Sequence, residues 1–403
     1  MKKLLDSKNG ITLIALVITI IVILILAGIS ITIMMGQDGI IKKTKEGSQN
    51  YQNAAIEEQK VLNSLFENII NGSTQTDKKE NDNSNGGEAE DDTRPTIAEV
   101  STIADAKRLN AKPVLTGSTI LKDDNDVEIN VPLGFNISQD SATVVANGIV
   151  IEDKNGNEFV WIPVSRSAFL NNKLLYSRSS FNADDYSKYT ETMSTDEQNS
   201  VELNNGFYIG RYEAGDSTIP TASTSSLRTE TSGFTNAVCI KKGYAPYNYI
   251  TKANAQNLAE NFDTVQGYTG ITGTKLCSSY AWDSAITYIQ KSVSGYATNS
   301  PQGNYSDVEN FTYTTINGTV ETKEKNNNVL IPTGQTTPVC GIYDLGGNVG
   351  EWSTETYTDG TYTPNVIRGG NYINSYSNCA SGHRAHWDNT ILPTIGFRIA
   401  LFL

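Results

Sequence analysis

The sequence is poor in histidine, cysteine and positive charge. It has only two histidines, so a histidine-rich metal site and most histidine-based acid–base schemes have little material. The four cysteines (Cys239, Cys277, Cys340 and Cys379) lie far apart without a Cys-x-x-Cys pair, which excludes the usual zinc and redox spacings and leaves disulfide pairing open. The formal charge of −13 opposes binding to nucleic acid.

One long run lacks charge altogether. Residues 11–35 contain no charged side chain, and a helix of that length spans roughly 37 Å, enough to cross a hydrocarbon layer of about 30 Å. We therefore expect a single transmembrane helix. Lys2, Lys3 and Lys8 precede the run and favour an N-terminus inside the cell. The rest of the chain is then expected outside, at the cell membrane.

The residues before this run also suggest processing. Residues 1–10 end in Lys-Asn-Gly and are followed by Ile-Thr-Leu-Ile, an order that resembles a type IV prepilin leader cut between Gly10 and Ile11. Pilins usually carry Glu at the fifth mature position, where this chain has Ala15. A plain signal anchor is therefore an equal alternative.

Three segments are expected before the main domain. Residues 36–72 place Tyr51, Leu62 and Phe66 at helical spacing among polar residues, which predicts an amphipathic helix. Residues 73–97 are polar and charged, a composition typical of a flexible linker. Residues 98–155 contain short β-like runs, Val127–Val131 and Thr143–Ile151, which we interpret as lead-in strands.

Residues 156–403 alternate short strands with loops rich in Gly, Asn and Ser. Helices are expected at Ala253–Asn261 and Tyr280–Lys291, so the pattern predicts an α+β fold with long loops. The segment from Tyr343 to Trp352 has three glycines in five residues, which allow positive φ and close packing, and it has Asp344 and Glu351 near its ends.

This loop and several other segments resemble the sulfatase-modifying-factor (formylglycine-generating enzyme) family. The matching segments, in chain order, are Glu158–Val164, Gly206–Glu213, Lys275–Asp283, Tyr343–Trp352, Ile367–Asn371 and Ile395–Arg398. The resemblance implies a C-type-lectin-like fold over residues 156–403.

The resemblance also implies a structural calcium site. The family's calcium positions fall on Asp344 and Glu351, which would supply side-chain oxygens, and on Gly347 and Val349, which would supply main-chain carbonyls. The alternative is a loop held only by the packing of Trp352 and by hydrogen bonds.

Catalysis is not expected. Formylglycine-generating enzymes use two cysteines to bind copper, and the matching positions here are Cys379 and Asn374. One thiol does not make a two-sulfur site. The resemblance therefore implies the fold without the oxidase chemistry.

The segment around these positions is rich in aromatic and amide side chains, which suit an exposed binding surface. In a lectin-like fold this stretch forms the face where ligands bind, although a merely polar surface or a buried aromatic core would explain it too. The candidate ligand-binding residues are Tyr372, Asn374, Tyr376, Asn378, His383, His386, Trp387 and Asn389.

Together these features predict a membrane-anchored bacterial surface protein that displays a non-catalytic lectin-like domain for an extracellular protein or glycan ligand. One alternative is a structural type IV pilin-like or pseudopilin-like subunit that self-assembles. The other is a formylglycine-generating oxidoreductase.

Overall fold

The computed structural model describes residues 92–173, 186–221 and 227–403, and Asp91–Leu403 form one compact unit. The predicted leader with its Gly10–Ile11 junction, the transmembrane helix, the amphipathic helix and most of the linker lie outside the described residues. Within the described ranges, no helix is both long and apolar enough to cross a bilayer. Ile97 is fully buried, so the folded unit begins before the predicted end of the linker.

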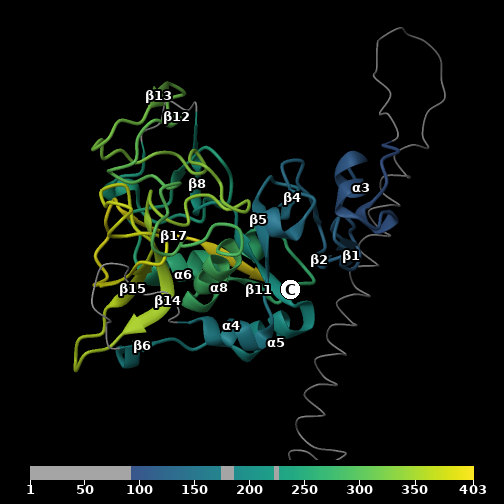
Figure 1. Cartoon of the computed structure of the whole chain (residues 1–403), viewed down its shortest axis with the longest axis horizontal. Helices are drawn as coiled ribbons and strands as arrows, with labels where there is room; N and C mark the ends of the chain where they lie inside the picture. Colours follow the sequence, from purple (N-terminus) through teal and green to yellow (C-terminus); the bar gives the residue numbers. More distant parts are fainter. Residues whose placement is uncertain (1–91, 174–185, 222–226) are drawn as a thin grey trace, which may run out of the picture. The chain divides into compact units, whose positions relative to one another are not determined.

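A six-stranded antiparallel sheet forms the centre of the unit (Figure 1). Its strands, in spatial order, are β11 (Gly273–Leu276), β18 (Ile399–Phe402), β7 (Gly206–Gly210), β5 (Glu158–Pro163), β4 (Val150–Asp153) and β3 (Phe135–Ile137). Residues 98–155, expected as lead-in strands, thus supply two strands of this sheet.

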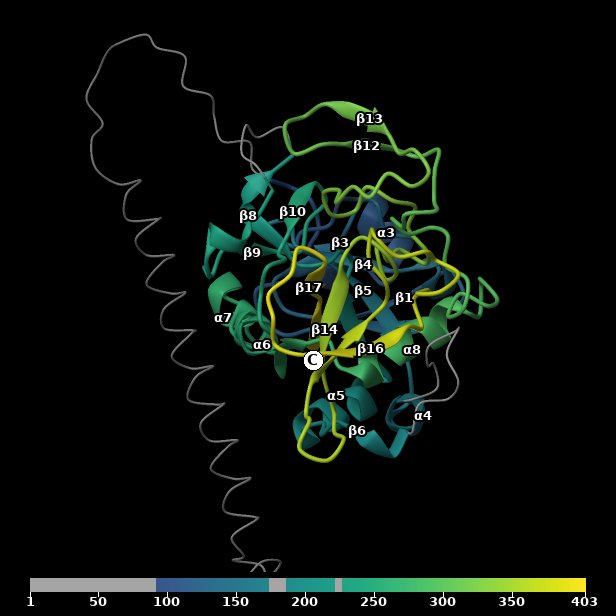
Figure 2. The same cartoon turned by 90° about the vertical axis from the view of Figure 1, so that its left-hand side faces the viewer.

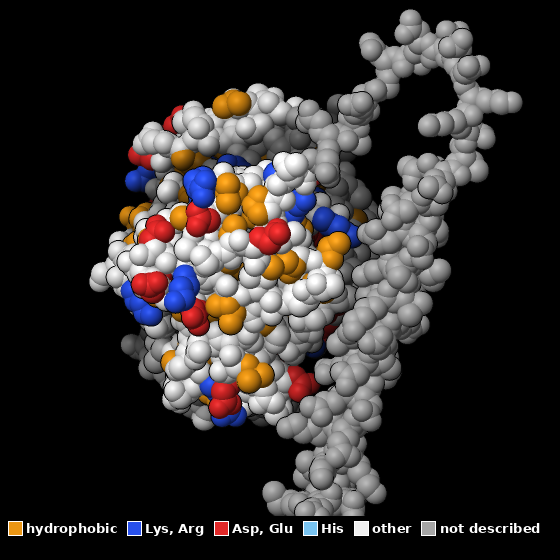
Figure 3. Space-filling view, turned by 90° about the vertical axis from the view of Figure 1, so that its right-hand side faces the viewer, with side chains coloured by type: hydrophobic (Ala, Val, Ile, Leu, Met, Phe, Trp, Pro, Cys, Tyr) orange, Lys and Arg blue, Asp and Glu red, His pale blue; other side chains and the backbone are white. Residues whose placement is uncertain are grey.

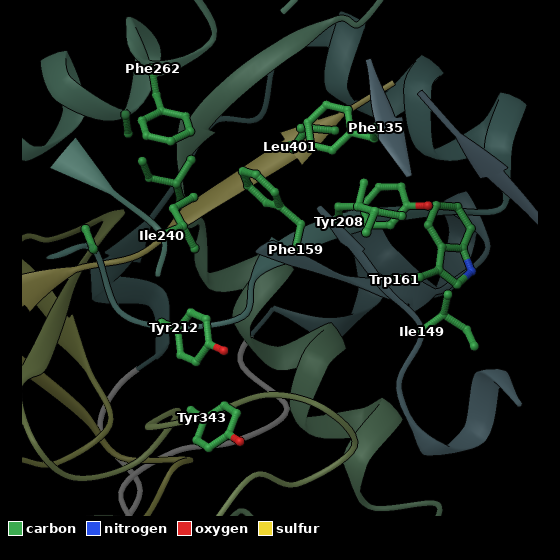
Figure 4. Packing of buried hydrophobic residues seen from close by; sticks show 14 of the residues in the cluster. Phe135, Ile149, Phe159, Trp161, Tyr208, Tyr212, Ile240, Phe262, Tyr343 and Leu401 are labelled. Atoms are coloured by element: carbon green, nitrogen blue, oxygen red, sulfur yellow. The ribbon is translucent and has the colours of Figure 1, made fainter. Parts of the chain in front are cut away.

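Both faces of the sheet are buried, because successive side chains of a strand point to opposite sides. Phe159 and Trp161 of β5 belong to one hydrophobic cluster, and Val160 and Ile162 belong to the other. Figure 4 shows Phe159, Trp161 and Tyr208 gathered with Phe135 on the first side. The uninterrupted apolar run of β5 is therefore what a strand between two cores requires.

Helices cover this sheet and the connections around it. They are α3 (Ile103–Arg108), α4 (Arg166–Asn172), α5 (Thr195–Asn204), α6 (Lys252–Glu260), α7 (Phe262–Gln266) and α8 (Ser279–Ile289). The side chain of Thr251 accepts a hydrogen bond from Asn254 N and begins α6, and Ser278 does the same for α8 with Ala281 N. The two helices predicted from sequence are confirmed to within two residues.

A second, five-stranded sheet carries the glycine-rich loop and the C-terminal face. Its order is β16 (Arg384–Trp387), β15 (Asn365–Arg368), β14 (Gly350–Tyr357) and β17 (Ile395–Phe397), and β6 (Tyr189–Thr190) pairs with the far end of β14. β14 and β17 run parallel, and the other pairs are antiparallel. The connection between β14 and β15 projects from the body of the unit (Figures 1 and 2).

Smaller sheets complete the unit. They are the hairpin of β1 (Thr119–Lys122) with β2 (Glu128–Val131), the group of β10 (Tyr244–Pro246), β8 (Gly215–Pro220) and β9 (Val238–Cys239), and the hairpin of β12 (Thr312–Thr314) with β13 (Val320–Thr322). β2 confirms the predicted strand at Val127–Val131.

The predicted strand at Thr143–Ile151 is mostly wrong. Residues Val145–Asn147 form a 3-10 turn, and only Val150 and Ile151 join a strand. Gly148 has φ of +98°, which ends the turn, and Asp123 accepts the hydrogen bond of Val145 N at 2.8 Å. A side chain from another segment therefore outweighs the local β propensity of Val144 and Val145.

The outer surface is mixed in character. On the face shown in Figure 3, hydrophobic side chains form separate small groups between charged side chains of both signs. Exposed apolar side chains scattered in this way are normal for a soluble surface.

Candidate functional site

The glycine-rich loop is held by buried hydrogen bonds around Asn348. This residue has φ of +52° and is fully buried. Its side chain accepts from Asn304 Nδ2 at 3.0 Å and donates to Glu213 Oε2 at 2.8 Å and to Ile331 O at 3.1 Å. A Cβ on Gly347 would lie 2.7 Å from Asn304 O, so the close approach of the two chains requires glycine.

A buried arginine pairs with the carboxylate at the end of this loop. Arg398 Nη2 lies 2.7 Å from Glu351 Oε1, and Arg398 Nε lies 3.0 Å from Glu351 Oε2. The same guanidinium donates to the carbonyls of Gly210, Tyr343 and Asp344 at 2.9, 3.0 and 3.0 Å. One side chain, located between β17 and β18, thus joins β14, β7 and the loop.

The other two carboxylates near Arg398 bond to protein donors as well. Glu213 accepts from Val349 N and Asn348 Nδ2, and Asp344 accepts from Gly334 N and Thr336 Oγ1. Burial, and then the nearby charge of Asp344, raises the pKa of Glu213 well above its usual value. Burial also raises the pKa of Glu351, to about 7.

The calcium site predicted at Asp344, Gly347, Val349 and Glu351 does not fit this arrangement. Each carboxylate oxygen of Glu351 and Asp344 accepts a hydrogen bond from a protein donor, and Glu351 faces a guanidinium rather than an open position. In the described part of the chain, no group of three or more His, Cys, Asp or Glu side chains is placed to hold a metal ion. The calcium site stays a prediction from the family resemblance.

A second buried ion-pair network lies beneath β15 and β16. Arg368 Nη2 lies 2.5 Å from Asp283 Oδ1, and Arg384 Nη2 lies 3.4 Å from Asp283 Oδ2. Arg384 Nε also lies 2.7 Å from Glu355 Oε2 on β14. All four side chains are at most 1% exposed. The network therefore fixes the sheet against α8.

Two more titratable groups border this network. Glu191 follows β6 and accepts from Ser279 N at 2.9 Å and from Thr354 Oγ1. Lys252 Nζ donates to the carbonyls of Thr354 at 2.9 Å and Glu355 at 2.7 Å. Burial lowers the pKa of Lys252 to about 8.

The structure divides the predicted ligand-binding residues into three groups. Asn378, Trp387 and Asn389 are exposed, Tyr372, Asn374, Tyr376 and His386 are half-buried, and His383 is buried. Placing His383 on the exposed face was wrong, because its Nδ1 lies 2.8 Å from Gly369 O inside the fold. By strand alternation, His386 and Trp387 project to opposite sides of β16.

Aromatic rings cluster at the end of β14, in what we name the aromatic shelf: Tyr357, Tyr362 and His386. Tyr357 stacks on His386 with ring centroids 4.1 Å apart and an interplanar angle of 8°, and Tyr362 meets His386 edge-on at 6.2 Å. Tyr362, in the connection between β14 and β15, is 52% exposed, and Trp387, on β16 next to His386, is 46% exposed. Rigid, exposed rings are suited to ligand contact.

Cys379 packs against Gly370, where an added Cβ would lie 2.9 Å from the Cys379 Cβ. The four cysteines form no disulfide with one another. The side chain of Asn374 accepts a hydrogen bond from Asn371 N at 3.1 Å.

The sequence did not reveal the buried ionic residues Glu191, Glu213, Asp283 and Glu355, or the contacts of Tyr357 and Tyr362 with His386. Glu191 and Glu355 meet at Ser279, which is 88 residues from the first and 76 from the second. No local spacing could reveal contacts over such separations. The available signal was compositional, since β14 carries two glutamates, Glu351 and Glu355, in a strand that is otherwise uncharged.

Comparison with known families identifies the domain type. The family model described as "Sulfatase-modifying factor enzyme 1-like domain" matches residues 187–402. A search of curated proteins found no match to the chain.

Several solved structures are similar to the chain. Treponema denticola variable protein 1 has 14% sequence identity and a TM-score of 0.36, and the alignment covers 62% of this chain and 96% of that protein. PvdO from Pseudomonas aeruginosa has 18% identity and a TM-score of 0.34, with coverage of 63% and 98%. CarF has 16% identity and a TM-score of 0.31, with coverage of 54% and 95%.

Proposed function

We propose that this chain, which belongs to the sulfatase-modifying factor enzyme 1-like family, uses its C-terminal domain to bind an extracellular protein or glycan without catalysing a reaction on it. The uncharged run of residues 11–35 would anchor the domain in the cell membrane. The binding surface would be the aromatic shelf on one side of β16 together with the exposed residues Asn378, Trp387 and Asn389, of which Trp387 projects to the other side of β16.

One observation carries this proposal: two exposed rings, Trp387 on β16 and Tyr362 in the connection between β14 and β15, belong to or adjoin a sheet that buried ion pairs hold rigid. Tyr362 and Trp387 are about half exposed, while Arg368 and Arg384 of the same sheet are buried and paired. Binding surfaces gain affinity when rigid elements hold the contacting side chains in place. Aromatic side chains also add contact area at low entropic cost.

The residues at the family's copper positions support a non-catalytic role. Cys379 has Asn374 in place of a partner cysteine, and an amide is a poor ligand for a soft metal. A formylglycine assay on a cysteine-bearing peptide tests this point directly. Conversion of that peptide by the purified chain would refute the non-catalytic assignment.

The binding role is tested with residues 91–403, which form a compact unit with their own core. A glycan array and a pull-down of cell-surface proteins would be run with the wild type and with Trp387→Ala and Tyr362→Ala. We expect each variant to lose about 30-fold in affinity, from roughly 2 kcal/mol for a central aromatic contact. Leu203→Ala is the matched control, because Leu203 is 81% exposed on α5. Equal binding by all four proteins would contradict the proposed surface.

A further inference from the structure

Strand β6 is attached to the second sheet by a short pairing. Thr190 pairs with Thr356 and Tyr189 pairs with Tyr357, and these two residues are the whole strand. A ladder of two residue pairs contributes little by itself. The position of β6 therefore depends on the side chains that flank it.

β6 also supports the aromatic shelf. The ring of Tyr189 meets the ring of Tyr357 edge-on at 5.1 Å, and Tyr357 stacks on His386 at 4.1 Å. Tyr189 is only 4% exposed. Movement of β6 away from β14 would remove the packing behind Tyr357.

The residue after β6 places a carboxylate beside a second buried carboxylate. Glu191 Oε1 accepts from Ser279 N, and Glu355 Oε2 accepts from Ser279 Oγ at 2.8 Å. One serine at the start of α8 thus bonds to both acids. Like charges brought this close disfavour the state in which both groups are ionised.

Among the described residues, no donor bonds to the buried Glu191 Oε2, and Glu355 Oε1 accepts no hydrogen bond but lies 3.7 Å from Lys173 Nζ. A buried carboxylate oxygen without a donor is costly, and protonation of that acid lowers the cost.

The charged groups that face Glu191 come from each neighbouring element. Glu355 of β14 opposes ionisation, and Lys173, which follows α4, favours it. Lys252 of α6 and Arg384 of β16 also interact with Glu191. Lys173 Nζ lies 3.7 Å from Glu355 Oε1, and Arg384 pairs with Glu355 at 2.7 Å. The cations in direct contact thus bond to Glu355, which makes Glu191 the acid that holds the proton.

We propose that a proton on Glu191 keeps β6 attached to β14, and that loss of this proton releases β6 and loosens the aromatic shelf. This inference rests on the proposed function for its biological meaning: ligand binding at the shelf would weaken as pH rises. The attachment of β6 can be measured without any ligand.

The direction of the pH effect follows from the environment of Glu191. Burial, and then the charge of Glu355, raises its pKa from the usual 4.5 to about 7. A carboxyl whose folded pKa is raised stabilises the folded arrangement fully below its usual pKa, and this contribution is lost as pH rises through 7. Because each pKa unit is a factor of ten, the full rise in the pKa of Glu191 changes the equilibrium constant between attached and released β6 by about 300-fold.

The test is amide hydrogen exchange of residues 91–403 at pH 6 and pH 8, corrected for the intrinsic exchange rate. We expect protection of the peptide spanning residues 187–191 to fall about tenfold more between pH 6 and pH 8 than that of a peptide from β5, because the rest of the roughly 300-fold difference is already lost below pH 6. Glu191→Gln, a neutral mimic of the protonated acid, should show the same corrected protection at both values. Glu202→Gln on α5 is the matched control and should behave as the wild type.

Two results would overturn the inference: equal corrected protection in the wild type at both pH values, or an unchanged pH dependence in Glu191→Gln. If Glu191→Gln does not fold, the wild-type comparison decides alone. Because this readout needs no ligand, its failure is distinct from a failure of the Trp387 binding test.

Discussion

The ion pair between Glu351 and Arg398 should be a main determinant of stability at the glycine-rich loop. Replacing Arg398 with Met removes the guanidinium that bonds to Glu351, Gly210, Tyr343 and Asp344. The change leaves Glu351 buried without its cation, next to two other buried carboxylates. Breaking a buried pair from one side costs about 3–5 kcal/mol, so we expect a loss of this size.

The measurement is urea unfolding of residues 91–403 at pH 7. Glu351→Ala should cost a similar amount, and the loss should be equal in calcium and in chelator because the partner is Arg398. Arg108→Met is the matched control, since its pair with Asp105 is 65% and 42% exposed and should contribute less than about 1 kcal/mol.

A double variant separates the pair from each residue alone. Glu351→Leu combined with Arg398→Met leaves neither charge unpaired, so its loss should be smaller than the sum of the two single losses by at least about 1 kcal/mol. A loss in Glu351→Ala that appears in calcium and disappears in chelator would refute this reasoning and favour the metal site instead.

Three further changes have definite expected outcomes. Asp283→Asn should lower the unfolding free energy by about 3–5 kcal/mol in a urea titration, because Arg368 and Arg384 lose their shared buried carboxylate. Gly303→Ala should cost about 1–3 kcal/mol in the same titration, because the new Cβ would lie 1.8 Å from Gly346 O and the backbone must shift. Cys379→Ser should leave the binding measured on the array or in the pull-down unchanged, and a loss of binding would assign that thiol a direct role.

Elements with a strong local signal were predictable from the sequence. The apolar run of β5, the capped helices α6 and α8 and the glycine-rich loop each have a pattern within about ten residues, and each is present in the structure. The turn at Val145–Asn147 was not predictable, because Asp123 supplies the hydrogen bond that stabilises it. Short strands such as β6 and β9 have too few residues to show a period.

The candidate site was predictable only at its surface. Asn378, Trp387 and Asn389 are exposed as their residue types suggest, whereas His383 turned inward to bond to Gly369. The pairing of Glu351 with Arg398 had no local signal, because Arg398 comes from a segment 47 residues away. Both residues are visible in the sequence, but only the fold shows that the Glu351 carboxylate is buried against the Arg398 guanidinium.

The residues that form the buried ion pairs are different from the residues whose rings are exposed at the surface. Arg368, Arg384 and Arg398 fix the sheets through partners that are at most 1% exposed, so the sheets do not depend on the exposed side chains for stability. Trp387→Ala should therefore lower the unfolding free energy by less than the loss of about 3–5 kcal/mol expected for Asp283→Asn, because almost half of the Trp387 side chain is exposed. If so, ligand contact and folding stability rest on different residues, and the surface can be altered without loss of the fold. A large stability loss from an exposed substitution would show that the rings belong to the core.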